Sequence, residues 1–249
     1  MVSLAVGSGN TGTGGDIIMT AGETTADSVV GGSVNLVAGA GTSNTAAKGG
    51  HITVTSGVGA SATGGSISMN SGSSTASTSG SIRIKSVDAG GGSLKGTSGY
   101  LSFSSGTTSC GTSGAFTIAS GSATHVKGGD ILLSVGAGTT FTGGDLILSA
   151  GLTTAQQSGG AVSVSAGYGS ASSSGKIVLK SLDAGTSGTS GYLSFSSGTT
   201  SSGTSGAILL HTGSATGGKG GDISISIGAG TKFAGGDIKQ FAGDNSDKT

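Results

Sequence analysis

A pair of small residues ending in glycine recurs along the whole chain, and its spacing limits the possible folds more than any other feature. Fifteen Gly-Gly or Ser-Gly pairs fall in one register, most of them 15 residues apart, with spacings of 16 to 19 as exceptions. Their second residues are Gly15, Gly32, Gly50, Gly65, Gly80, Gly99, Gly114, Gly129, Gly144, Gly160, Gly175, Gly191, Gly206, Gly221 and Gly236. A fixed period of this kind is typical of repeat proteins, whose units bury apolar surface against their neighbours.

Each glycine pair is followed by the same short pattern: variable, apolar, variable, apolar, variable, small, and usually glycine. Examples are HITVTSG from His51 and SISMNSG from Ser66. Of the thirty apolar positions, 29 hold Ile, Leu, Val, Met or Phe, and only Gln240 is polar. Strict alternation predicts a strand with one buried face.

The repeats predict an all-β fold, a single parallel β-solenoid (β-helix) of about fifteen short repeats with Gly-Gly corners. Stacked strands would form a continuous core, and glycine would allow sharp corners, often at positive φ. The chain has no proline, so every residue of a strand could donate its backbone N–H to the neighbouring strand. One repeat per coil is favoured over two, because two would leave large loops in every repeat.

The domain prediction is one continuous solenoid over residues 1–249 with an internal duplication, in which 66–159 resembles 161–249. Its clearest sign is the phrase SGYLSFSSGTTS, which occupies 98–109 and returns unchanged at 190–201. We interpret the phrase as a strand with its turn, copied within a block of six repeats. It is predicted to be scaffold rather than a duplicated active site.

Composition excludes several classes of function. Glycine supplies 55 of the 249 residues, which is typical of disordered low-complexity chains. The regular alternation of apolar and variable positions in every repeat argues against disorder. The 11 basic and 11 acidic residues balance, which argues against nucleic acid or an anionic membrane as a partner. No apolar run is long enough for a membrane span, and the start does not resemble a secretion signal. Cys110 is the one cysteine, so no internal disulfide can form, and we interpret it as a tolerated small residue.

Aspartate follows the glycine pair in five of the fifteen repeats. These residues are Asp16, Asp130, Asp145, Asp222 and Asp237. Calcium-binding β-rolls carry G-G-x-G-x-D, whereas this chain has GGDI without the second glycine. Capping of turn N–H groups is therefore preferred over calcium binding.

Other polar residues also fail to form a catalytic pattern. The matching stretches KSVDAG at 85–90 and KSLDAG at 180–185, with Arg83 and Lys176 nearby, predict exposed ion pairs, with a sugar or anion contact as the alternative. The histidines His51, His125 and His211 share no alignment with an acidic or cysteine cluster. Tyr100 and Tyr192 are expected to face outward. We therefore predict no catalytic, cofactor-binding or metal residue, no cofactor and no enzymatic activity.

GGDILLSVGAG and its relatives resemble the Gly/Ser/Thr-rich β-solenoid repeats of microbial and algal surface proteins, extracellular filaments and viral fibres. The resemblance implies a structural role outside the cell or on a cell or particle surface. It gives the expected function: a rod-like subunit or spacer of an extracellular filament or fibre.

Two alternative functions remain open. Insect-type antifreeze solenoids also use short Thr/Ser-rich coils, so ice binding is the first alternative, although the outward strand positions carry Thr only at Thr20, Thr53, Thr55 and Thr117. A carbohydrate-binding or adhesive surface module is the second. The expected partner is a further copy of the chain, or else polysaccharide or ice.

The chain ends support the expectation of self-assembly. The last repeat loses the apolar pattern at GDNSDKT, whereas VSLAVGSG near the start already alternates like a strand. An open N-terminal edge would belong to a longer chain or would meet another subunit. Contact between unlike ends does not close and gives filaments.

Overall fold

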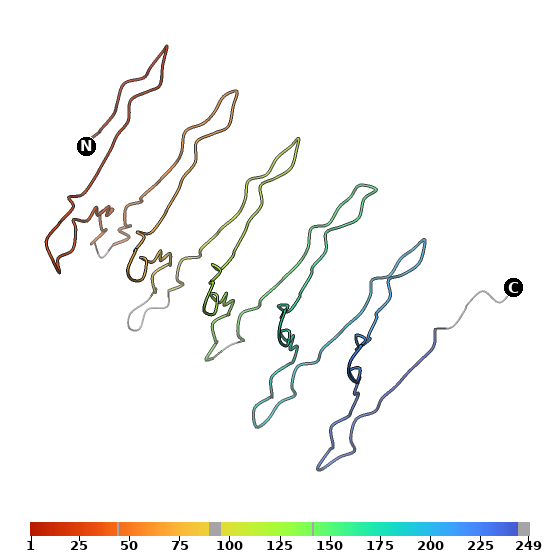
Figure 1. Ribbon diagram of the computed structural model, residues 1–249. Helices are drawn as coiled ribbons and strands as arrows, with labels where there is room; N and C mark the ends of the chain where they lie inside the picture. The colour runs from red at the N-terminus through yellow and green to blue at the C-terminus, as the bar shows by residue number, and fades with distance from the viewer. Residues whose placement is uncertain (44, 90–95, 141, 244–249) are drawn as a thin grey trace. The chain divides into compact units, whose positions relative to one another are not determined.

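The structure is a computed structural model that describes residues 1–43, 45–89, 96–140 and 142–243. No helix and no strand forms among these residues; extended segments alternate with bends and short turns (Figure 1). The chain divides into two units, Met1–Gly129 and Asp130–Thr249, and each is considered by itself. The boundary falls within a GGD sequence, directly after the second glycine of a pair.

The predicted parallel β-solenoid is therefore wrong for the described residues. They contain no strand, and 230 of the 235 described residues are exposed. Alternation does give extended segments, but a strand also needs a ladder of hydrogen bonds to a neighbouring strand. The extended segments form no such ladder, so the β-helix, its filled interior and its stacked coils are all absent from this part of the chain.

The chain instead forms loops, and seven of them are closed by one backbone hydrogen bond. The second glycine of a pair donates its N–H to the carbonyl of the glycine that ended the preceding segment. We call this closure a neck. It occurs at Gly32–Gly22, Gly50–Gly39, Gly65–Gly57, Gly80–Gly72, Gly129–Gly121, Gly160–Gly151 and Gly175–Gly167, with N···O distances of 2.8 to 3.4 Å.

Close approach across the neck explains the second glycine of the pair and the small residue before the loop. A Cβ added to Gly65 would lie 3.3 Å from both the backbone nitrogen of Gly57 and the Cβ of Ser56. At Gly50 the distance to the Cβ of Ala38 would be 3.4 Å. Four of the five described residues that are half-buried are small residues at this position: Ala21, Ala38, Ser56 and Ser86. The neck thus brings the backbone of the second glycine close to the end of the preceding segment.

The expectation that the corners turn at positive φ is also wrong for the described glycines. Only Gly111 and Gly203 among them have positive φ, at 122° and 123°, and neither is one of the fifteen repeat glycines. The glycine of the pair is required for space across the neck rather than for an unusual backbone angle. Ser28 and Ala46 supply two left-handed turn positions, at φ 60° and 57°.

Ser and Thr hydroxyls organise the polar loops. In several loops a hydroxyl two residues after the glycine that ends a segment accepts a backbone N–H two residues further on. Ser74 Oγ accepts both Ala76 N–H at 3.4 Å and Ser77 N–H at 2.9 Å. The same acceptor role belongs to Thr24, Thr153 and Thr200. These bonds turn the backbone locally without a core.

Alternation survives as a difference in exposure rather than as burial. Ile131 and Leu133 are 51% and 60% exposed, whereas Leu132 between them is 85% exposed. The side of Ile131 and Leu133 is therefore less exposed than that of Leu132, whereas Val178 at 62% is no more exposed than Leu179 at 65%. No apolar side chain among the described residues is buried, so the described chain has no core.

Candidate interaction surface

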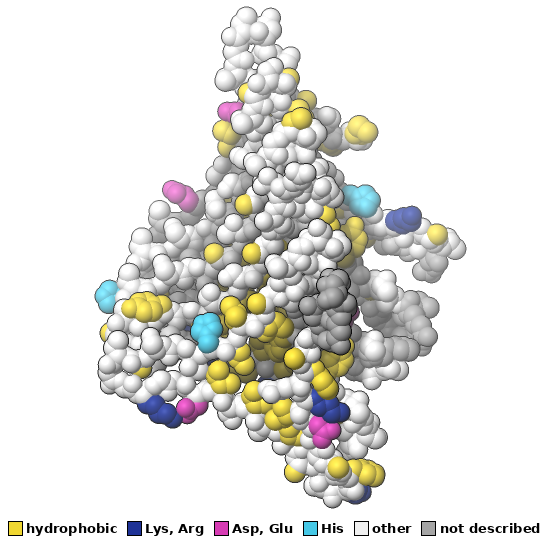
Figure 2. Space-filling model, turned by 90° about the vertical axis from the view of Figure 1, so that its right-hand side faces the viewer, with side chains coloured by type: hydrophobic (Ala, Val, Ile, Leu, Met, Phe, Trp, Pro, Cys, Tyr) yellow, Lys and Arg dark blue, Asp and Glu magenta, His cyan; other side chains and the backbone are white. Residues whose placement is uncertain are grey.

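Large apolar side chains are exposed along the whole described part of the chain. Figure 2 shows many of them at the visible surface, with few charged groups among them. Within each extended segment the two apolar side chains lie two residues apart, on the same side of the backbone. Exposed apolar surface of this extent marks an interaction site or an aggregation-prone segment.

The duplicated phrase has the same local geometry in both copies. Thr108 Oγ1 donates to the carbonyl of Cys110 at 3.2 Å, and Thr200 Oγ1 donates to the carbonyl of Ser202 at 3.3 Å. Each bond lies directly before the one positive-φ glycine of its loop. The copy with serine has one further bond, from the Ser202 N–H to Thr200 Oγ1 at 3.4 Å.

The aromatic and aliphatic side chains of the phrase are also equally exposed in the two copies. Tyr100 and Tyr192 are both 90% exposed, as the outward position predicts. Leu101 and Leu193 are about half exposed, and Phe103 and Phe195 are somewhat more so. We call residues 98–109 and 190–201 the two aromatic segments. Each presents the same side chains to its surroundings.

The five aspartates are not brought together as a calcium site. Asp222 accepts a hydrogen bond from Lys219 Nζ at 2.8 Å, and Asp237 lies 3.5 Å from Lys239 Nζ. Asp16 and Asp145 have no hydrogen-bond or ion-pair partner in the described ranges. Across the described chain, no three of the His, Cys, Asp and Glu side chains form a group that could hold a metal ion.

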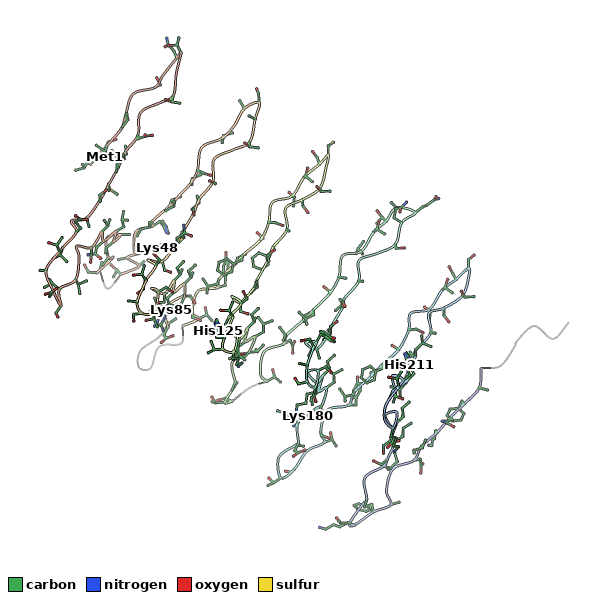
Figure 3. All side chains as sticks on the ribbon, in the orientation of Figure 1. Met1, Lys48, Lys85, His125, Lys180 and His211 are labelled. Atoms are coloured by element: carbon green, nitrogen blue, oxygen red, sulfur yellow. The ribbon has the colours of Figure 1, made fainter. Side chains whose placement is uncertain are left out.

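The predicted ion pairs at the KSVDAG and KSLDAG stretches are not formed between described residues. Lys85 and Lys180 project from extended parts of the chain (Figure 3). The histidines do not meet an acid either; His125 Nδ1 lies 3.1 Å from Thr124 Oγ1, within its own loop. Cys110 is exposed and unpaired. No pocket forms among the residues that the structure places.

The neck hydrogen bonds and the hydroxyl-capped loops were missed by sequence reasoning. The sequence does carry a sign of each. Gly-x-Ser or Gly-x-Thr follows many segments and marks the hydroxyl-capped loops, and a small residue precedes each loop where the neck forms. The solenoid prediction used neither signal, because it assumed that the coils stack.

No helix in the described part of the chain is long and apolar enough to cross a membrane. Comparisons with protein-family models, with curated proteins and with solved structures give no match to this chain.

Proposed function

We propose that the protein is a non-catalytic structural protein whose copies associate through their extended apolar segments to build a filament or matrix. The observation that supports this role is the exposure of the alternating apolar side chains in repeat after repeat. A chain that repeats one interaction surface many times fits assembly better than it fits catalysis, which needs a few convergent groups.

The amount of exposed surface supports association between many copies. The chain exposes 24599 Å², whereas a folded monomer of its 23.0 kDa mass exposes about 9600 Å². A standard protein interface buries only about 1600 Å² in total. A single dimer contact would therefore leave most of the excess exposed, while contacts on several sides would cover more of it.

Charge does not oppose this association. The formal net charge is zero and only 9% of the residues are charged, so copies repel one another little. Backbone N–H and C=O groups along the segments are also available to pair with another extended chain. An extracellular or particle-surface location is part of the proposal, on the resemblance of the repeats to surface and filament proteins.

Electron microscopy and light scattering across a concentration series test the proposal. We expect scattering to rise with concentration and filaments or a matrix to appear, with stronger assembly in sulfate salts, which favour apolar burial. A monodisperse, monomeric protein at millimolar concentration would contradict it. In that case, inhibition of ice recrystallisation or binding to a polysaccharide would identify the alternative function.

A further inference from the structure

We propose that the two aromatic segments, 98–109 and 190–201, are equivalent docking segments for further copies of the chain, so that each chain has two binding sites. This inference rests on the proposed self-association and specifies where it occurs. Among the extended apolar segments, it makes these two stretches the contacts on which assembly depends.

The equivalence of the two segments is structural as well as sequential. Gly111 and Gly203 adopt φ of 122° and 123°, and a Cβ at either would lie 3.9 Å from the hydroxyl of the preceding Thr. The turn that ends each segment therefore has one shape. Whatever docks on one segment meets the same side chains and the same turn on the other.

The chemistry of these segments favours pairing with an identical segment. The core of each is YLSFSS, six residues with two aromatic side chains and without charge, proline or glycine. Short segments of high β-propensity and low charge pair in register and interdigitate identical side chains. Aromatic side chains also bury large areas and add favourable ring contacts.

The surroundings of each segment remove the usual obstacle to such pairing. No Asp, Glu, Lys or Arg occurs from Gly96 to Val126 or from Ala184 to Gly218. Like charges would therefore not oppose one another when two copies align. The large excess of exposed area and the zero net charge point to a further copy as the occupant.

Two equivalent sites on each chain determine how assembly proceeds. A chain with one site stops at a dimer, whereas a chain with two can bind a partner at each and continue. Wild-type protein should then form open-ended assemblies. Loss of either segment should end growth at two copies.

Sedimentation velocity of the full chain and of four variants tests whether each chain has two docking sites. The variants are L101E/F103E, L193E/F195E, the combination of all four substitutions, and the control S33E/N35E. The control adds the same two charges at variable positions of the second repeat. We expect wild type and control to form large species, each segment variant to form dimers, and the combined variant to stay monomeric.

The other outcomes separate this inference from the proposed function. If the segment variants assemble as wild type does, the contacts lie elsewhere and the inference fails while self-association stands. If each segment variant is monomeric alone but the two form dimers when mixed, the segments are complementary rather than equivalent, and the inference is overturned. If wild type itself is monomeric, both proposals fail.

Discussion

The backbone N–H of Gly32 donates to the carbonyl oxygen of Gly22 at 2.8 Å and closes the loop between them. A Cβ on Gly32 would lie 3.1 Å from the nitrogen of Gly22 and 3.2 Å from the Cβ of Ala21. This one contact unites three features of the repeat: the glycine pair, the small residue and the glycine that follows it. The neck, rather than a strand ladder, is the recurring structural unit.

Replacing Gly32 by alanine should open this neck. The added Cβ requires the two backbones to separate, and loss of one hydrogen bond costs about 1 kcal/mol. We expect the amide of residue 32 to exchange with deuterium roughly fivefold faster, as that free energy implies. Gly22→Ala is the matched control, since a Cβ there meets nothing within 4 Å. Equal acceleration in both variants would show that close approach is not the reason for glycine.

Removing the hydroxyl of Ser74 should loosen its loop. Ser74 accepts two backbone N–H groups, from Ala76 and Ser77. In Ser74→Ala both amides should exchange faster, with a loss of about 0.5 to 1.5 kcal/mol for each bond. Ser73→Ala serves as the control, because Ser73 makes no hydrogen bond in the structure. Unchanged exchange of the amides in Ser74→Ala would contradict the role of the hydroxyl.

Alanine at Gly111 or at Gly203 should strain both turns to the same degree. Their φ values of 122° and 123° are ones that a residue with a Cβ rarely adopts. The cost is about 1 to 3 kcal/mol at each position. NMR shifts of the residues around each turn should change by similar amounts. Gly106→Ala is the control, since its surroundings are open; clearly unequal changes at the two turns would contradict their structural equivalence.

Calcium should have no effect on this protein. Asp222 and Asp237 each lie beside a lysine ammonium, and the described acidic residues form no cluster. Titration calorimetry with millimolar calcium should show no heat of binding, and far-UV circular dichroism should not change. A saturable heat signal would mean that the aspartates gather in a way the structure does not show.

The sequence was informative about local structure and uninformative about pairing. Alternation at Ile131 and Leu133 correctly distinguishes a less exposed side from the open side at Leu132. Glycine pairs mark the loop ends, and the repeated phrase has one geometry in both places. A period of two describes the two faces of a segment, but it does not specify which surface covers the apolar face. The solenoid prediction supplied that surface by assuming that neighbouring repeats stack.

The candidate surface was only partly predictable. The outward position of Tyr100 and Tyr192 follows from alternation, and both side chains are open. The duplicated phrase was interpreted as scaffold because its leucine and phenylalanine were assigned to a core. With Leu101 and Phe103 exposed, the same residues become available for contact. The prediction and the structure differ because the burial of a side chain depends on which surface covers it. The sequence of one repeat does not specify that surface.

Hydrogen–deuterium exchange of the full chain at low and at high concentration tests the central claim most directly. In dilute solution we expect amides of the aromatic segments to exchange within seconds, because these extended stretches form no ladder. At high concentration the same amides, at 98–109 and 190–201, should become protected as copies cover one another. Strong protection that is the same at every concentration would show pairing within one chain and would contradict the account.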